Sequence, residues 1–247
     1  MLDISLNERL ANFVKVMLKV VREDAVLEFS QDQMISKVVD TGHVAMVQLA
    51  VDKAAFERYD VDEQVFGIEL NTLEEYLRIM KPDQFLEMTH EESTNQATLT
   101  ILGNHVGMQT IDPASIPNPD LPKIEDKLTC RVRISGEDLV ETMKYAAASG
   151  DLIKFTMNET KFSVHVNKVG INYRRDFAEE ELRGLDCGQA ATSQFSIDYL
   201  KPLNSILAKV DEVNIAFGEN LPMLMEFSEL DGTVSVKYLL APRITDS

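Results

Sequence analysis

The sequence predicts an α+β protein made of two similar domains, each with two helices packed on antiparallel sheets. One observation is an internal repeat: Phe29 and Phe66 recur as Phe155 and Phe195 after 126 and 129 residues, about half of the 247-residue chain. A second is a proline-rich segment between the copies, because four of the eight prolines lie within residues 112–122. A third is that helix and strand patterns follow the same order on both sides of that segment. Together they predict an N-terminal domain at 1–115, a connecting loop at 116–127 and a C-terminal domain at 128–247.

The first half begins with an amphipathic helix. Apolar residues from Leu6 to Val21 recur at steps of three and four, which is the helical period. A second helix is predicted to begin at Asn71 and to end at Pro82, which cannot continue a helix. Short β-rich runs supply the strands of this half, at residues 26–29, 34–39, 43–51, 66–70, 85–89, 97–102 and 106–111.

The second half repeats this order. Ser135 is placed to cap a helix that ends at Gly150. A fourth helix is predicted to start near Tyr199, because Pro202 then falls in its first turn. The strands are predicted at residues 128–134, 152–156, 161–166, 171–177, 213–217, 223–227 and 233–240. Each half is thus expected to hold two helices and about eight strands.

The composition is that of a globular protein, with 45% hydrophobic and 26% charged residues. No apolar run approaches the roughly 20 residues that cross a bilayer. The N-terminus has no basic segment followed by an apolar core, so no signal peptide is expected. Two cysteines are too few for a disulfide framework, which predicts reduced thiols and a cytoplasmic protein.

The net charge of −17 argues against nucleic-acid binding if the charge is spread evenly. A small basic face on an acidic body is compatible with the same composition, so the positions of the basic residues decide. Two explanations of the acidity stay open, which are solubility and adaptation to intracellular salt.

Catalytic motifs are absent from the sequence. It has no glycine-rich phosphate loop, no dinucleotide-binding turn and no nucleophile elbow, and its four histidines show no metal-ligand spacing. His165 is expected to be a polar cross-strand residue. Cys130 lies on the apolar side of its strand, which favours the core over a nucleophile. No enzyme activity, cofactor or metal is therefore predicted.

Basic residues gather on the predicted helices. Lys15, Lys19 and Arg22 share one face of the first helix. If all four helices stand on one face of the sheets, these cations line that face together with those of the other helices, Arg78, Lys81, Lys144, Lys201 and Lys209. The alternative is that long cations simply coat exposed helices, which also carry acids, Glu74, Glu75, Glu137 and Glu141.

Three segments carry a family resemblance. They are residues 209–222, which end in Gly218-Glu219-Asn220-Leu221-Pro222, then Tyr238-Leu239-Leu240-Ala241-Pro242-Arg243-Ile244, and in the first half Asp40-Thr41-Gly42-His43-Val44-Ala45-Met46-Val47-Gln48-Leu49. These segments resemble the signatures of the sliding clamps known as proliferating cell nuclear antigen. The resemblance runs the full length in the same order, and the short loops and the ending look more like an archaeal clamp than a eukaryotic one.

The resemblance implies a DNA clamp fold in which three copies form a pseudo-sixfold ring around duplex DNA, with the helices lining the hole. It implies non-specific contact with DNA phosphates through Lys15, Lys19, Arg78, Lys81, Lys144, Lys201 and Lys209. Asn12, Glu75 and Ser205 stand where the family often has a further basic residue. Weak contact is therefore expected, and closure of the ring rather than affinity holds the clamp on DNA.

The resemblance also implies that an edge strand of one copy pairs with an edge strand of the next. The candidate strands lie at 105–111 and 171–177, and the interface residues are His105, Val106, Met108, Ile111, Ile171, Tyr173, Arg174, Arg175 and Phe177. Arg174 and Arg175 are consecutive, so in a strand they point to opposite faces. By analogy one of them meets an acid across the interface, with Glu137, Asp138 or Glu141 as candidates. The alternative is two surface arginines.

A further implication is a pocket beside the connecting loop that receives short peptides with a glutamine, an aliphatic residue and two aromatics. The pocket residues that carry over are Val39, His43, Val44, Met46, Leu121, Pro222, Leu239, Ala241 and Pro242. Where many relatives have tyrosine near the end, this chain has Leu239, so a different partner preference is expected. Ordinary core under a loop is the alternative for Val44 and Met46.

The predicted function is therefore that of a homotrimeric processivity factor and docking platform for DNA replication and DNA repair. The implied partners are DNA polymerase, flap endonuclease, DNA ligase and a clamp loader of the replication factor C type. Two alternatives stay open. One is a subunit of a heteromeric clamp, and the other is a metal-dependent nucleic-acid hydrolase, for which the sequence shows no acids at recognisable spacing.

Overall fold

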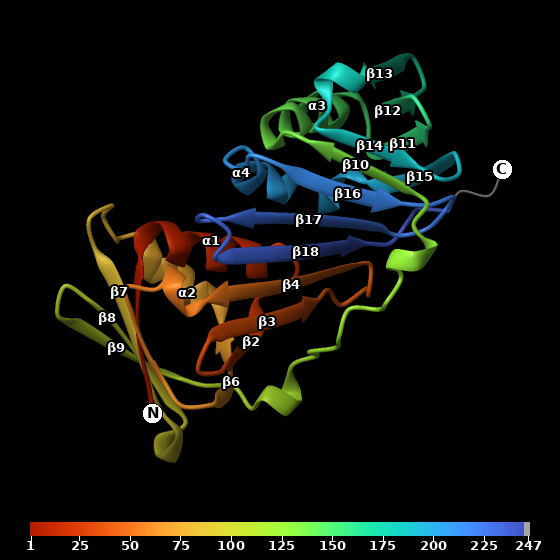
Figure 1. Cartoon of the computed structure of the whole chain (residues 1–247). Helices are drawn as coiled ribbons and strands as arrows, with labels where there is room; N and C mark the ends of the chain where they lie inside the picture. Colours follow the sequence, from red (N-terminus) through yellow and green to blue (C-terminus); the bar gives the residue numbers. More distant parts are fainter. Residues whose placement is uncertain (245–247) are drawn as a thin grey trace. The chain divides into compact units, whose positions relative to one another are not determined.

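The computed structural model describes residues 1–244 of the 247-residue chain (Figure 1). The described chain forms two compact units, one of Met1–Asp120 with Glu229–Val236, the other of Leu121–Ser228 with the residues from Lys237 onward. Each half of the chain runs through one strand, one helix, five strands, one helix and three strands. This order and the antiparallel strand pairing confirm the predicted α+β class. The predicted domain limits stay a prediction.

The first half builds two groups of antiparallel strands and two helices. One sheet has the order β5-β1-β7-β8-β9, and in the other group β2 pairs with both β3 and β6 while β3 pairs with β4. Helices α1 and α2 contact each other and pack on these strands. The elements are β1 (Leu2–Asn7), α1 (Glu8–Lys19), β2 (Asp24–Phe29), β3 (Gln33–Val39), β4 (Ala45–Asp52), β5 (Arg58–Val61), β6 (Gln64–Glu69), α2 (Leu70–Leu77), β7 (Phe85–Glu91), β8 (Gln96–Ile101) and β9 (Asn104–Gln109).

Helix α1 begins at Glu8, two residues after the predicted start, because Asn7 ends β1 and caps the helix. The Asn7 side chain accepts a hydrogen bond from the N–H of Leu10 at 2.9 Å. Leu6 belongs to β1, where it lies opposite Leu86 of β7. Leu6 fits the helical spacing of the apolar residues that follow, although it belongs to the strand. The spacing alone therefore does not show where the strand ends and the helix begins.

Helix α2 begins at Leu70, and its cap is Glu69 rather than the predicted Asn71. The Glu69 carboxylate accepts hydrogen bonds from the N–H groups of Asn71 and Thr72 at 2.9 and 2.8 Å. Burial opposes the charged form of Glu69, but the bonds from Thr72 and Asn71 outweigh it and lower the pKa of this carboxyl. A carboxylate is also favoured by the dipole at a helix N-terminus.

The proline-rich segment 112–122 is fastened to the first unit as far as Asp120. The Ile116 side chain is 3% exposed and lies against Gly67, where an added Cβ would come within 2.5 Å of its Cδ1 atom. Lys37 of β3 forms an ion pair with Asp120 at 2.7 Å. This part of the segment is therefore an ordered layer of the first unit, not a free linker.

The second half repeats the topology of the first. Strand β10 pairs with β14 and β16, as β1 does with β5 and β7, and the sheet β13-β12-β11-β15 matches β4-β3-β2-β6. Helix α3 packs on β12 and β13 and contacts α4. The elements are β10 (Cys130–Ile134), α3 (Gly136–Ser149), β11 (Leu152–Asn158), β12 (Lys161–Lys168), β13 (Ile171–Phe177), β14 (Gly184–Cys187), β15 (Ala191–Ser196), α4 (Asn204–Leu207), β16 (Val213–Phe217), β17 (Met223–Glu229) and β18 (Val234–Leu240).

Helix α3 has the limits that the sequence predicts. Ser135 accepts a hydrogen bond from the N–H of Asp138 at 3.1 Å, and the helix stops at Gly150. Its first residue, Gly136, packs directly on the end of α4, where an added Cβ would lie 2.0 Å from the carbonyl oxygen of Leu207. Because that oxygen is backbone and cannot move aside, only glycine fits this contact.

The fourth helix is shorter than predicted. Residues Ile197–Tyr199 and Lys201–Leu203 form 3-10 turns, and only Asn204–Leu207 is α-helical. Pro202 lies inside the second of these turns, where its missing N–H leaves no intrahelical bond broken.

The repeated phenylalanines occupy the core of each unit. Phe29 packs on Phe66 with ring centroids 5.7 Å apart, and Phe155 packs on Phe195 at the same 5.7 Å. In the second unit the cluster also contains Phe162 and Phe217, at 5.5 and 6.2 Å from Phe155. The repeat therefore records the packing of two cores built on one plan.

Candidate functional site

Three of the predicted DNA-facing cations in the first unit surround one carboxylate. The packing of α1 on α2 brings Lys15 Nζ to 3.7 Å from Glu74 Oε1, while Lys19 Nζ donates to Glu74 Oε2. Arg78, one turn further along α2, lies 3.3 Å from Glu74 Oε1. These four residues, which we call the Glu74 cluster, carry three positive charges and one negative, a net charge of +2.

The Glu74 cluster is partly sheltered from solvent. The side chains of Lys15, Lys19 and Glu74 are 14%, 25% and 21% exposed, whereas Arg78 is 70% exposed. The hydrogen bond from Lys19, together with the charges of Lys15 and Arg78, outweighs burial and lowers the pKa of Glu74. The carboxylate therefore stays ionised at neutral pH and competes for the cations around it.

The other predicted cations stand outside this cluster. Lys81 follows α2, Lys144 lies on α3 and Lys209 follows α4; all three are exposed, and none forms an ion pair within residues 1–244. Lys201 pairs with Asp198 at 3.0 Å. That the cations of both units lie on one DNA-facing surface of the protein stays a prediction.

Strand β9 is the outer strand of its sheet. A two-residue hairpin joins it to β8 through Leu102 and Gly103, whose φ angles are 50° and 74°. Residues next to such a turn bond across the hairpin, and bonded and non-bonded pairs then alternate. The N–H groups of His105, Gly107 and Gln109 are therefore directed to the open edge. An edge of this kind is a template for another strand.

Some predicted interface residues of this edge are already engaged in the first unit. The predicted strand at 106–111 extends too far, because β9 ends at Gln109 and Ile111 instead exchanges two backbone hydrogen bonds with Gly67, at 2.8 and 2.9 Å. Met108 is 7% exposed, while His105 is exposed and Val106 is half-buried. The open part of this edge is thus the backbone of Asn104–Gln109.

Strand β13 has the predicted bounds and is the outer strand of the other sheet in the second unit. Arg174 lies opposite His165 of β12, whereas the Arg175 guanidinium lies 4.5 Å from the centroid of the Phe177 ring. The two arginines thus point to opposite faces, as predicted. Their acids are local, since Arg174 pairs with Asp176 and Arg175 with Glu181. Pairing across a subunit interface stays a prediction.

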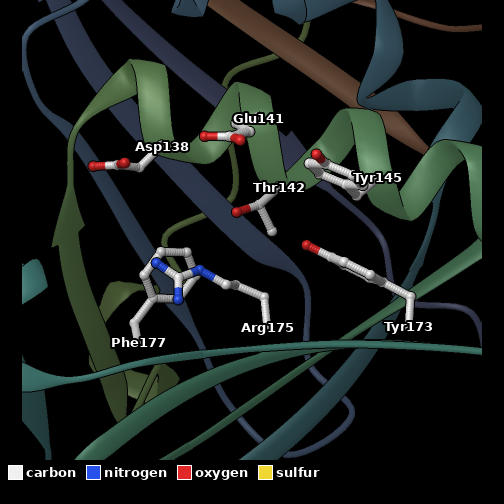
Figure 2. A pocket seen from close by; sticks show the side chains of 7 residues that line it. All are labelled: Asp138, Glu141, Thr142, Tyr145, Tyr173, Arg175 and Phe177. Carbon is white, nitrogen blue, oxygen red and sulfur yellow. The ribbon is translucent and has the colours of Figure 1, made fainter.

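A hollow of about 250 Å³ lies between α3 and β13, and Figure 2 shows the side chains that line it. Asp138, Glu141 and Tyr145 enter it from the helix, and Tyr173 and Arg175 from the strand. The rings of Tyr145 and Tyr173 lie nearly parallel with centroids 6.0 Å apart. Two of the three predicted acids, Asp138 and Glu141, therefore lie beside β13, together with the tyrosine pair.

Asp176 joins the neighbouring strands on the other face of this sheet. It accepts hydrogen bonds from Arg174 Nε at 2.9 Å and Ser163 Oγ at 2.7 Å, and Lys161 Nζ lies 2.8 Å away. Burial opposes the charge of Asp176, but these partners outweigh it and hold the pKa far below its usual value. His165 lies between Lys154 and Arg174 across the strands, which confirms its expected cross-strand position.

Replacing Asp176 by Asn is expected to destabilise the second unit in a pH-dependent way. The folded-state pKa is lowered, so the ionised group stabilises the fold above its ordinary value of 3.8 and loses this effect as the pH falls through the folded pKa. Because the side chain is 39% exposed, solvent limits the loss at pH 7 to about 1 kcal/mol. Urea unfolding of both proteins at pH 7 and at steps below pH 4 measures the difference.

The control is Asp83→Asn, which changes an exposed residue without an ion pair in the described chain. The difference in the free energy of unfolding between Asp176→Asn and the parent should become smaller as the pH falls. The same difference for Asp83→Asn should stay near zero at every pH. A gap for Asp176→Asn that is constant with pH contradicts the role assigned to its charge.

The predicted pocket residues of the first unit lie around a loop organised by Asp40. The Asp40 carboxylate accepts hydrogen bonds from the N–H groups of Val44, Ala45 and Gly42 at 2.6, 2.7 and 3.0 Å. These bonds hold His43 exposed with φ at 52°. Val39 is 1% exposed and lies opposite the half-buried Met46.

The predicted pocket residues of the second unit lie in the connecting segment, just before β17, and at and after the end of β18. Leu239 is 7% exposed, and Tyr238 before it is fully buried and donates its hydroxyl to the Tyr199 carbonyl at 2.8 Å. The remaining residues, Leu121, Pro222, Ala241 and Pro242, are half-buried. That both sets form one peptide pocket stays a prediction.

Cys130 is a core residue, as predicted. It is 0% exposed, and burial raises the pKa of its thiol to about 12. Its sulfur lies 3.0 Å from that of Cys187 on the paired strand β14, and both thiols are free. A buried neutral thiol of this kind is a poor nucleophile.

Within residues 1–244, no group of three or more His, Cys, Asp or Glu side chains is arranged to hold a metal ion. In the same part of the chain, no helix has both the length and the apolar character needed to cross a membrane.

Two residues that shape these sites are not singled out by the sequence predictions. Glu74 counts there only as an acid on the second helix, although its i,i+4 spacing to Arg78 predicts their ion pair. Its contacts with Lys15 and Lys19 depend on the packing of two helices, for which one sequence gives no signal. Asp40 two residues before Gly42 is the pattern of an Asx turn, a signal that could have found it.

Comparison with known proteins places these features in a family. Residues 1–112 match the family described as proliferating cell nuclear antigen, N-terminal domain. The DNA polymerase sliding clamp of Haloarcula marismortui is 31% identical over 230 residues, which is 92% of each chain. That of Methanosarcina barkeri is 27% identical over 245 residues, 99% of each chain.

Solved structures show the same fold. One holds the C-terminal region of FEN-1 bound to A. fulgidus PCNA; that chain matches with a TM-score of 0.93 and 24% identity over 100% of both chains. PCNA from Thermococcus kodakaraensis matches with a TM-score of 0.88 and 22% identity, over 98% of this chain and 100% of that one.

Proposed function

The chain belongs to the proliferating cell nuclear antigen family, and we propose that it is a sliding clamp for DNA polymerase. The observation that carries the proposal is the extent of the likeness. Relatives with the name DNA polymerase sliding clamp match along 88% to 99% of the chain, so the likeness extends through both halves of the repeat. In this proposal three copies close into a ring around duplex DNA in the cytoplasm.

The ring contact is proposed to join β9 of one copy to β13 of the next. Both strands are outer strands of their sheets, and both leave backbone groups open along one edge. The same two edges on every copy make a head-to-tail contact, which closes only at a fixed number of copies. The proposed contact residues are those predicted from the sequence, with Ile111, Met108 and Phe177 contributing from positions that are already buried or bonded in their own unit.

DNA is proposed to pass along the helices. The cations of the Glu74 cluster, with Lys81, Lys144, Lys201 and Lys209, supply weak contacts to phosphates of any sequence. A weak contact lets a closed ring move along the duplex, because enclosure rather than attraction keeps it on the DNA.

Partner proteins are proposed to bind by short peptides at the pocket residues on the Asp40 loop, at the start of β17 and after β18. The bound FEN-1 region in the A. fulgidus structure supports this, and we extend it to DNA polymerase, flap endonuclease and DNA ligase. An ATP-driven loader opens and closes the ring. None of these roles requires a chemical step by this chain.

The test is the length of polymerase products on primed circular DNA with a clamp loader. Products should become several-fold longer when this chain is added. Unchanged product length counts against the clamp role. A chain that stays monomeric alone but forms a ring with unlike partners identifies a heteromeric clamp, and cleavage of nucleic acid with magnesium or manganese identifies the hydrolase alternative.

A further inference from the structure

We propose that Glu74 is a built-in competitor for DNA phosphate, which keeps the contact between the ring and the duplex weak. The inference rests on the proposed function and adds to it a residue that regulates the DNA-facing surface. It is carried by the Glu74 cluster, in which one carboxylate touches three of the four predicted DNA-facing cations of the first unit.

The two carboxylate oxygens of Glu74 contact all three cations of the cluster. Its Oε2 accepts from Lys19, and its Oε1 faces Lys15 at 3.7 Å and Arg78 at 3.3 Å. A DNA phosphate needs the same donors, so it must either displace the carboxylate or share its cations. Displacement is costly because Lys15 and Lys19 are mostly sheltered, and sheltered pairs are screened less by salt than exposed ones.

Competition with DNA phosphate for the cations is a property of Glu74 and not of every acid on α2. Glu75, the next residue of α2, is exposed and forms no ion pair within residues 1–244. Both residues contribute one negative charge to the same helix. Glu75 therefore repels DNA only through the general field, whereas Glu74 also occupies the donors.

The consequence for sliding follows from how phosphate binding depends on salt. Each phosphate that a protein neutralises steepens the fall of affinity with salt by about one power of salt concentration. A cation held by Glu74 contributes less to this salt dependence than a free cation does. The chain thus has cations on its helices, but their attraction to the duplex stays weak enough for the ring to slide along DNA.

The experiment compares three full-length proteins, the parent, Glu74→Gln and Glu75→Gln. Their binding to a fluorescent linear duplex is measured by anisotropy from about 50 to 200 mM salt. Glu74→Gln should bind more tightly and with a steeper salt slope, so that its advantage over the parent shrinks about threefold per phosphate gained across this range. Glu75→Gln should keep the slope of the parent.

A second pair of variants tests whether Lys19 carries the gain. Lys19→Gln should weaken binding in both backgrounds, and by a larger factor in the Glu74→Gln background, where no carboxylate holds the lysine. Equal slopes for Glu74→Gln and Glu75→Gln overturn the proposal, as does weaker binding by Glu74→Gln, which would make Glu74 an organiser of the cations. Absence of binding by all three proteins overturns it as well.

These outcomes are separate from those that concern the clamp role. Light scattering first confirms that each variant has the mass of the parent. If the parent lengthens polymerase products but the salt slopes of Glu74→Gln and Glu75→Gln are equal, the clamp role stands and the role of Glu74 is rejected. A parent that fails to lengthen them removes the clamp role, whatever the slopes.

Discussion

Gly107→Pro is expected to convert the proposed ring to monomers. The N–H of Gly107 is directed to the open edge of β9, and proline removes this donor and places its ring in the path of an approaching strand. Losing the bond and leaving its acceptor unpaired costs about 2–4 kcal/mol at each contact. A closed ring of three repeats this loss three times, about 6–12 kcal/mol, which lowers the trimerisation constant by roughly 10⁴-fold or more.

Light scattering at micromolar concentration measures this change. The parent should have about three times the chain mass of 27.8 kDa, and Gly107→Pro should have the chain mass itself. Gly107→Ala is the matched control, because its added Cβ meets only the flexible side chain of Gln96 and its N–H remains. Trimers of Gly107→Pro, or monomers of Gly107→Ala, contradict the pairing of β9 through its backbone.

Phe155→Ala is expected to cause a large loss of stability in the second unit. The ring is fully buried and lies within 6.2 Å of three others, Phe162, Phe195 and Phe217, so its removal leaves a cavity at the centre of that unit. Truncation of a buried phenylalanine costs about 3–5 kcal/mol. That is a large share of the roughly 5–15 kcal/mol that stabilises an ordinary domain.

Urea unfolding followed by circular dichroism gives the free energy of unfolding for this comparison. Phe85→Ala is the control, because the Phe85 side chain is 47% exposed and its loss should change the free energy of unfolding by less than about 1 kcal/mol. A loss below about 1.5 kcal/mol for Phe155→Ala speaks against a four-ring core.

The order of elements was largely predictable from the sequence, and short edge strands were not. Strand β13 is predicted with its bounds, because alternation and the turn before Ile171 mark it clearly. Strands β5 and β14 have only four residues each and lie at the edges of their sheets, and a run such as Arg58–Val61 alternates over too few residues to mark a strand. Their pairing with β1 and β10 provides the stability that their own sequence lacks.

For the candidate sites too, some features could be predicted from the sequence and others could not. The predicted cations, edges and loop residues came from a family resemblance and from patterns along one element. The contacts that define the Glu74 cluster join residues as far apart in sequence as Lys15 and Glu74, and they arise only when two helices pack. The tyrosine pair of Figure 2 likewise joins α3 to β13 and has no signature in either segment.

If enclosure holds this protein on DNA, the protein should be released when a loaded circular plasmid is made linear. The chain is loaded with a clamp loader onto a nicked circular plasmid, the complex is separated from free protein by gel filtration, and one restriction enzyme then cuts the plasmid once. The protein should remain with the circle and leave the linear DNA from its ends. Protein that stays on the linear DNA as firmly as on the circle would contradict retention by enclosure.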